Sequence, residues 1–97
     1  MTAEIVMDEA YRLSVYPNPV QQRATVELAV KERQEVSVRL YDVLGRRVAT
    51  LHNDPLPAQE LRRLRLDISS TGLTSGTYFL RVRGEDLAAT EQLTIVR

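Results

Sequence analysis

Short runs of alternating apolar and polar residues, each closed by a turn signal, limit this chain to an all-β fold. In the run 76–83, Tyr78, Leu80 and Val82 fall on one face of an extended chain, and a period of two is the pattern of a strand that buries one face. Turn signals recur roughly every 8–12 residues, as in a β-sandwich. The other runs that we predict as strands are 11–16, 24–30, 36–41, 46–51, 61–68 and 90–97. We therefore predict an immunoglobulin-like antiparallel β-sandwich of about seven strands.

Prolines and glycines mark where these strands end. Pro17-Asn18-Pro19 stops the first strand, because proline donates no hydrogen bond to a ladder. The sequence from Asp42 to Gly45 suits a type I turn whose glycine takes a positive φ. The stretch from His52 to Ala58 contains two prolines and is predicted to be the longest loop.

Two further local patterns bear on the fold. Over 60–66 a helix competes with a strand, and we favour the strand because Leu66 and Ile68 fit a period of two better. A turn is predicted to follow at 69–72. Gly76 and Tyr78 have the spacing of a tyrosine corner, in which the phenol reaches back to a backbone group while its ring packs in the core.

Length and charge bound what the chain does. Its 97 residues suffice for one domain, and we expect a linker over 1–11 and the sandwich over 12–97. With 13 basic and 13 acidic residues the net charge is zero, which disfavours nucleic acid and anionic membranes as partners. No run approaches the roughly 20 apolar residues of a membrane span, and the N-terminus lacks the order of a signal peptide. An exported form is therefore expected to take its signal peptide from a longer parent chain.

The polar residues do not predict an active site. His52, the only histidine, lies in the proline-rich stretch without a placed serine partner for a catalytic triad. Asp42 or the pair Asn53-Asp54 is a weak candidate for a loop calcium site, and a solvated turn is the better interpretation. Two arginine clusters are better explained as outward faces of strands than as a nucleic-acid patch. The clusters are Arg46 and Arg47, and Arg62, Arg63 and Arg65. We predict no catalytic residue, no metal and no cofactor.

Four stretches taken together resemble the type A C-terminal sorting domain of the type IX secretion system. They are Leu13 to Pro19 (LSVYPNP), Val38 to Val48 (VRLYDVLGRRV), Leu73 to Val82 (LTSGTYFLRV) and Thr90 to Arg97 (TEQLTIVR). Each is weak alone, but all four occur in the order and spacing of that family. The resemblance implies a β-sandwich at the C-terminus of secreted enzymes and adhesins of Bacteroidetes-type bacteria.

The resemblance also implies partners and site residues. In that family the domain directs its parent through an outer-membrane translocon, and a cell-surface sortase then removes it and joins the cargo to anionic lipopolysaccharide. The parent is thus expected to be secreted or held at the cell surface after passing the periplasm. The cut is expected upstream of Leu13. The implied sorting-motif positions are Tyr16, Pro17, Asn18 and Pro19; Gly45 and Arg46; Ser75, Gly76 and Tyr78; and Gln92, Leu93, Thr94, Ile95, Val96 and Arg97.

Such a role needs a surface or an edge strand for a receptor rather than catalysis, and we expect the final strand to be an edge strand with one free side. A second interpretation is a carbohydrate-binding or spacer module of a multidomain glycosidase or adhesin. That module would need a row of exposed aromatic residues, and the chain has only four tyrosines and one phenylalanine. A third interpretation is an adhesion domain that forms homodimers, which an edge strand and zero net charge also favour.

Overall fold

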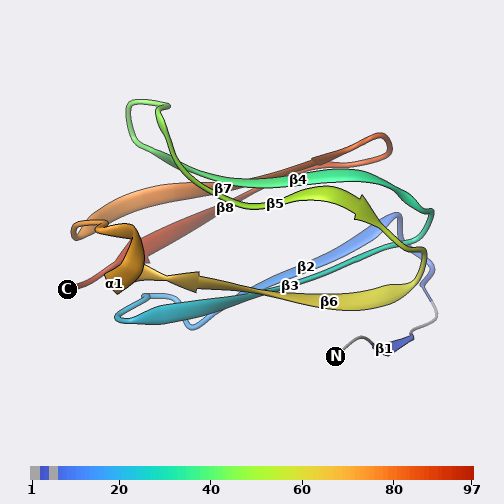
Figure 1. The fold of residues 1–97 in the computed structure, drawn as a ribbon, viewed down its shortest axis with the longest axis horizontal. Coiled ribbons are helices and arrows are strands. Elements are labelled where there is room, and N and C mark those ends of the chain that lie inside the picture. Colours follow the sequence, from blue (N-terminus) through green and yellow to red (C-terminus); the bar gives the residue numbers. More distant parts are fainter. Residues whose placement is uncertain (1–2, 5–6) are drawn as a thin grey trace.

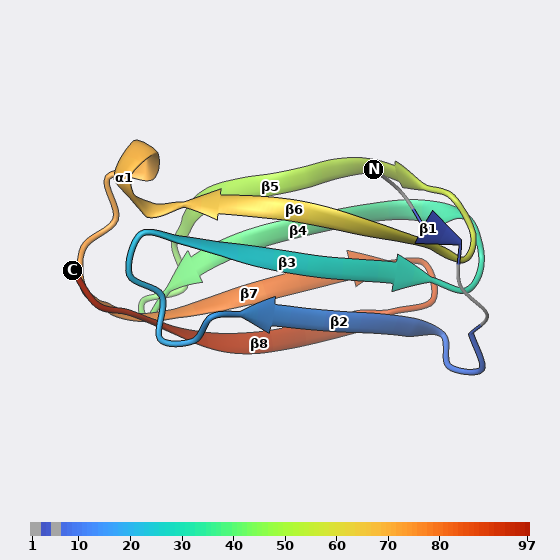
Figure 2. The same ribbon diagram turned by 90° about the horizontal axis from the view of Figure 1, so that it is seen from below.

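Two antiparallel sheets packed face to face form the protein (Figures 1 and 2). The computed structural model describes residues 3–4 and 7–97. One sheet has the strand order β1-β6-β3-β2 and the other β5-β4-β7-β8. The elements are β1 (Ala3–Glu4), β2 (Tyr11–Tyr16), β3 (Arg23–Val30), β4 (Gln34–Asp42), β5 (Arg47–Leu56), β6 (Glu60–Asp67), α1 (Ile68–Thr71), β7 (Gly76–Gly84) and β8 (Ala88–Ile95). The predicted all-β sandwich is confirmed.

The core lies between the inner faces of the two sheets. In β4, Val36, Val38 and Leu40 are at most 1% exposed, while the residues between them point outward, as the alternation predicts. Burying an apolar side chain of this size contributes about 1.5–3 kcal/mol, so packing holds this cysteine-free chain together. The largest fully buried side chains come from both sheets and include Leu28, Leu40, Leu56, Leu66, Ile68, Leu80, Leu93 and Ile95.

The predicted loop over 52–58 is wrong, because β5 continues to Leu56. Pro55 lies within the strand, opposite Glu35 of β4. The reason is that β5 lies at the edge of its sheet. An edge strand tolerates proline where the missing N–H would have faced away from the neighbouring strand. Leu56 is buried in the core and holds the end of this strand in place.

A single helical turn, α1, stands where a plain turn was predicted. The strand over 60–66 is confirmed, but β6 ends at Asp67, so Ile68 belongs to α1. The Asp67 carboxylate accepts hydrogen bonds from the backbone N–H of Ser69 at 3.1 Å and of Ser70 at 3.4 Å. An aspartate N-cap satisfies donors that the first turn of a helix leaves free.

Part of the segment expected to be linker contacts the sandwich. Ala3 and Glu4 pair with Leu61 and Glu60 of β6, and the side chain of Met7 is 3% exposed. Residues 8–10 between Met7 and β2 are exposed.

Several connections gather at one end of the long axis. Figures 1 and 2 place α1, residue 97, the β2–β3 connection and the β4–β5 turn at that end. We call it the motif end, because three of the four motif stretches have residues in these connections or beside them and the fourth supplies the end of β8.

Candidate functional site

The final strand, β8, is an edge strand, as expected. It pairs with β7 from Arg83↔Ala88 to Gly76↔Ile95, and it is the last strand in its sheet. Its outer side, however, is free over only part of its length, because residues of the N-terminal proline motif cover the rest.

Asn18 of that motif binds the backbone of β8 through both ends of its side-chain amide. Its Nδ2 donates to the carbonyl oxygen of Gln92 at 3.1 Å, and its Oδ1 accepts from the N–H of Thr94 at 3.1 Å. A side-chain amide with one donor and one acceptor in use acts here as a short piece of added strand. The flanking prolines, Pro17 and Pro19, both follow cis peptide bonds.

Val20 continues this contact with its own backbone. Its N–H donates to the carbonyl oxygen of Thr94, and its carbonyl oxygen accepts from the N–H of Val96, both at 2.8 Å. The Val20 side chain is 0% exposed. Sequence analysis did not identify Val20; the signal available was an apolar residue directly after the proline motif. The first and the last predicted motifs are therefore brought together.

The third motif reaches the same end of β8. The backbone N–H of Arg97 donates to Oγ of Ser75 at 2.8 Å, and Nη1 of Arg97 donates to the carbonyl oxygen of Leu73 at 2.6 Å. Ser75 was a predicted motif position, but the part played by the Leu73 carbonyl oxygen has no side-chain signal in the sequence.

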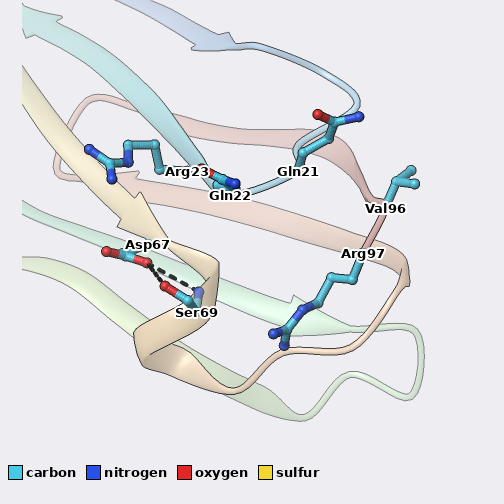
Figure 3. A pocket seen from close by; sticks show the side chains of 7 residues that line it. All are labelled: Gln21, Gln22, Arg23, Asp67, Ser69, Val96 and Arg97. Carbon is cyan, nitrogen blue, oxygen red and sulfur yellow. Dashed lines mark hydrogen bonds between the residues drawn. The ribbon is translucent and has the colours of Figure 1, made fainter.

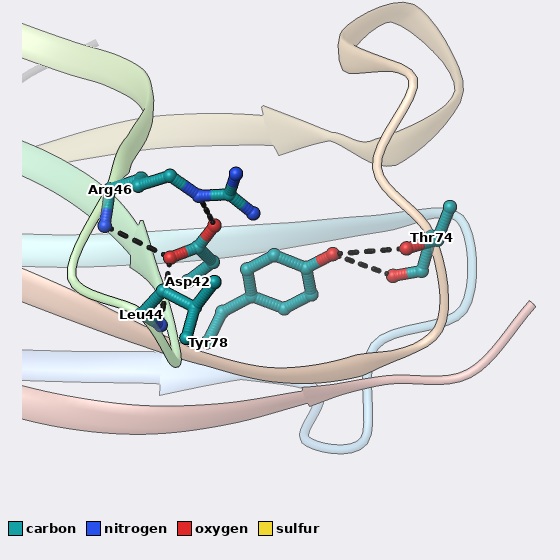
Figure 4. Close-up of polar contacts among 5 residues, drawn as sticks. All are labelled: Asp42, Leu44, Arg46, Thr74 and Tyr78. Carbon is teal, nitrogen blue, oxygen red and sulfur yellow. Dashed lines mark hydrogen bonds and ion pairs between the residues drawn. The ribbon is translucent and has the colours of Figure 1, made fainter.

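Tyr78 forms the predicted tyrosine corner (Figure 4). Its hydroxyl donates to the carbonyl oxygen of Thr74 at 2.9 Å, and the residue is 7% exposed. Gly76 starts the strand at φ 153°, a conformation that side chains rarely adopt. Gly76 and Tyr78 thus fix how the chain enters β7.

The second motif is the turn between β4 and β5. Gly45 has φ 81°, as predicted. One oxygen of Asp42 accepts from the N–H of Leu44 at 3.0 Å and of Arg46 at 2.9 Å, and the other accepts from Nε of Arg46 at 2.8 Å (Figure 4). These bonds, above all the one from the Arg46 N–H, lower the pKa of Asp42. Asp42 lies opposite Tyr78 in the β4–β7 ladder, so this motif also borders the motif end.

A hollow of about 620 Å³ opens at the motif end (Figure 3). Val96, which is 45% exposed, and Arg97 line it from β8. Arg23 adds a second cation, and Asp67 has one carboxylate oxygen 2.7 Å from Oγ of Ser69, a bond that lowers the pKa of Asp67. The remaining lining residues are Gln21 and Gln22. The hollow offers mixed polar and apolar contacts beside the predicted recognition strand.

The described residues hold no group of three or more His, Cys, Asp or Glu side chains placed to bind a metal ion. His52 lies in β5, with Nε2 3.0 Å from the carbonyl oxygen of Asp54. The Asp42 carboxylate is already engaged within its turn. Within residues 3–4 and 7–97, no helix has the length and apolar character to cross a membrane.

The two arginine clusters do not form one patch. Arg46 pairs with Asp42 at 2.8 Å, and Arg63 pairs with Glu27 at 2.7 Å. Arg62 lies opposite the buried Leu28, so it falls on the inner side of β6.

The aromatic residues do not form one platform either. Tyr16 is 45% exposed on β2, whereas Tyr41 and Phe79 lie opposite each other in the other sheet. Tyr78 is buried, and Tyr11 packs against the core. All the aromatic residues lie within the described part of the chain, and they do not form the flat exposed row expected of a carbohydrate-binding module.

Comparison with known proteins agrees with this architecture. The sequence model of a family described as "Secretion system C-terminal sorting domain" matches residues 14–96. No curated protein matches the chain. Among solved structures, the crystal structure of dimeric latent PorU from Porphyromonas gingivalis is similar, with a TM-score of 0.68 and 22% sequence identity over 89% of this chain. The match covers 9% of that protein. At this identity the likeness shows a shared fold.

Proposed function

Because the chain belongs to the family of secretion-system C-terminal sorting domains, we propose that it directs a longer parent protein through the type IX secretion system. The translocon of that system is the proposed partner, and the parent protein is proposed to reach the cell surface or the medium through the periplasm. The role is one of recognition, so the domain itself supplies a surface and no chemistry.

The observation that supports this proposal best is the contact between the first and the last motif. Asn18 and Val20 bind the backbone of residues 92–96, and Ser75 binds Arg97. Residues far apart in the sequence thereby form one continuous surface. A receptor that binds this surface distinguishes the folded domain from an unfolded segment of the same sequence.

The contact also refines how the final strand is recognised. Asn18 and Val20 bind the Gln92 carbonyl oxygen, both backbone groups of Thr94 and the Val96 N–H, so a receptor strand cannot pair with these groups. Recognition at the motif end is therefore proposed to use side chains, among them the exposed Val96 and the lining of the adjacent hollow.

We further propose that a surface sortase cuts the chain before Leu13 and attaches the released parent to the cell surface. Exposed residues 8–10 lie between the buried Met7 and the start of β2. An exposed connection is the kind of segment that proteases reach most readily. The expected new N-terminus lies within residues 9–13.

The test is export of a reporter. A signal peptide and a reporter protein are fused ahead of residues 1–97 in a bacterium with a type IX system, and the reporter is measured in the periplasm, at the surface and in the medium. The intact domain is expected to give surface reporter, deletion of 92–97 to abolish it, and Asn18→Ala to reduce it severalfold. Asn53→Ala is the matched control, because Asn53 is an exposed asparagine of β5.

Circular dichroism and protease resistance of each purified domain separate export defects from unfolding. A folded domain whose reporter stays in the periplasm contradicts the sorting role. Sequencing the N-terminus of the shed domain tests removal separately, and reporter that retains the domain at the surface contradicts the sortase step alone.

A further inference from the structure

The outer face of the sheet β5-β4-β7-β8 carries arginines without acidic partners. Within the described residues, no ion pair joins Arg39, Arg81 or Arg83 to a carboxylate. The ion pairs of the described residues are Arg12–Glu9, Arg46–Asp42 and Arg63–Glu27. Arg81 and Arg83 are exposed and Arg39 is half-buried. We call these three residues the arginine face.

The register places two of these cations against each other. Arg39 lies directly opposite Arg81 in the β4–β7 ladder, an arrangement that destabilises a sheet. Nε of Arg39 is buried without a hydrogen-bond partner, which adds a desolvation cost. The Arg81 guanidinium lies 5.3 Å from the centre of the Tyr41 ring, a contact that holds the cation over the sheet without neutralising it. An anion bound at Arg81 would reduce the repulsion between the two cations.

Beside the arginine face, half of β8 has free outer backbone groups. Both the N–H and the carbonyl oxygen of Thr94 point away from β7, because they bind Asn18 and Val20. In an antiparallel ladder every second residue points the same way, so the backbone groups of Thr90 and Ala88 also point outward. The described residues provide no backbone partner for them. An extended segment is able to add here as a further strand.

Such a segment would lie within reach of the arginines. Arg81 lies opposite Thr90, and Arg83 lies opposite Ala88, so only short side chains separate β7 from the free edge. Successive outward residues of a strand are about 6.4–6.8 Å apart. Acidic residues at every second position of an added strand therefore match the spacing of Arg81 and Arg83.

The surface is also hollowed on both sides of the opposed pair. A hollow of about 290 Å³ is lined by Arg39 and Arg83, with the carboxylates of Glu35 and Glu85 at the same hollow. A second hollow, of about 300 Å³, is lined by Tyr41, Arg81 and Thr90, with Asp42 beside them. Arginine and aromatic side chains are the residues enriched at the energetic centres of protein interfaces.

We propose that the arginine face and the free half of β8 bind an extended acidic segment of a partner protein, with acidic residues at every second position. The segment pairs with the backbone of Ala88 and Thr90, and its carboxylates pair with Arg83 and Arg81. The inference deepens the proposed function, on which it rests for its biological role, by giving the chemistry of one partner segment. The binding itself is testable without secretion.

The test uses the 97-residue chain labelled with ¹⁵N and a blocked peptide in which glutamate alternates with threonine. At low ionic strength, peptide is expected to shift the amide signals of residues 88–92 and the side-chain signals of Arg81 and Arg83. Arg81→Gln with Arg83→Gln should weaken binding at least tenfold. Arg33→Gln with Arg65→Gln, two exposed arginines outside the arginine face, is the matched control and should leave affinity unchanged.

A second pair of variants tests the added strand. Thr90→Pro removes an outward N–H and no bond to β7, and it should weaken binding at least tenfold, whereas Thr90→Val keeps that N–H and should bind as the parent chain does. Equal loss in both arginine variants, unchanged binding by Thr90→Pro, or signal shifts confined to other regions would overturn the proposal. A dimer that forms through β8 and excludes the peptide would also overturn it, because the occupant would then be a second copy.

The two proposals fail in different ways. If the reporter is not exported while the alternating peptide binds as expected, the sorting role is lost and the binding surface stands. If export succeeds while the arginine variants bind the peptide normally, the binding surface is lost and the sorting role stands.

Discussion

The outer faces of the two sheets treat charge in opposite ways. On the sheet β1-β6-β3-β2, Arg23 lies opposite Asp67, and Glu27 lies opposite Arg63 with 2.7 Å between Oε2 and Nε. On the other sheet, Arg39 lies opposite Arg81. Opposite charges across a ladder stabilise a sheet and like charges destabilise it. The first face therefore has oppositely charged residues facing each other, although no ion pair joins Arg65 to a carboxylate among the described residues, whereas the second face has the like-charge pair of Arg39 and Arg81.

This comparison separates stability from recognition within a small domain. Both faces cover the same core. We call the outer face of the sheet β1-β6-β3-β2 the matched face, and it shows that this fold accommodates cross-strand pairs of opposite charge. The second face carries cations beside a free strand edge. This difference is the basis for proposing that a partner binds the second face.

Disrupting the core that the two sheets share should destabilise both outer faces together. Leu80, on the inner side of β7, is 0% exposed, and Leu80→Ala leaves a cavity that costs about 2–5 kcal/mol. Urea unfolding should show this loss, and both faces should be lost in a single transition. A variant as stable as the parent chain would mean that the core does not support both faces.

Removing the contact between the motifs should have the next largest effect. Asn18→Ala deletes two hydrogen bonds to β8, each contributing about 0.5–1.5 kcal/mol. It also extends the free outer edge of β8 toward Thr94, so the variant should self-associate more than the parent chain does. Sedimentation at increasing concentration measures this association, and Asn53→Ala is the control that should stay monomeric to the same degree as the parent.

Acid should lower the stability of the whole domain, partly through the carboxylates of the sheet β1-β6-β3-β2. The Arg63 guanidinium lowers the pKa of Glu27 from its ordinary value of 4.5, and hydrogen bonds from Ser69 and Ser70 lower the pKa of Asp67 from 3.8. A lowered pKa in the folded state contributes stability above the ordinary value and loses it as pH falls through the folded value. Unfolding midpoints should therefore fall below about pH 4.5.

The double variant Glu27→Gln with Asp67→Asn should flatten this pH dependence, although Asp42 retains part of it. The arginine face contains no such carboxylate, so Arg81→Gln should leave the shape of the pH profile unchanged. An equally steep profile in the carboxylate double variant would contradict the assignment.

The smallest effect should be a gain. Arg39→Thr removes the like-charge pair and the unpartnered Nε, and it should raise the free energy of unfolding by about 0.2–1 kcal/mol. The same variant should bind the alternating acidic peptide less tightly. A loss of stability would mean that the Arg39 side chain packs more favourably than its charge repels.

The sequence predicted most of the fold because alternation is a local signal. Runs such as 77–83 and 24–30 bury one face, and the patterns of β7 and β3 agree with them. Pro55 misled the prediction of β5, since whether a strand tolerates proline depends on its place in the sheet. That place is set by which strands pair, which no single segment contains.

The candidate site was predictable only as separate pieces. The resemblance identified Asn18 and Thr94 as motif positions, but their hydrogen bond joins residues 76 apart and exists only once the sandwich closes. Arg39 and Arg81 each fit the outward face of a strand, and their opposition follows from the β4–β7 register. Val20 gave no polar signal, because its backbone makes the contact.

The bond between Asn18 and Thr94 also has a consequence in time. A chain is made from its N-terminus, so the proline motif leaves the ribosome long before its partner strand exists. Closing a loop of this length carries an entropic cost, so we expect the contact between Asn18 and Thr94 to form late in folding. A chain that lacks residues 92–96, because its synthesis is incomplete or its end has been removed, therefore cannot form the joined surface. A receptor for that surface would bind only chains whose synthesis is complete.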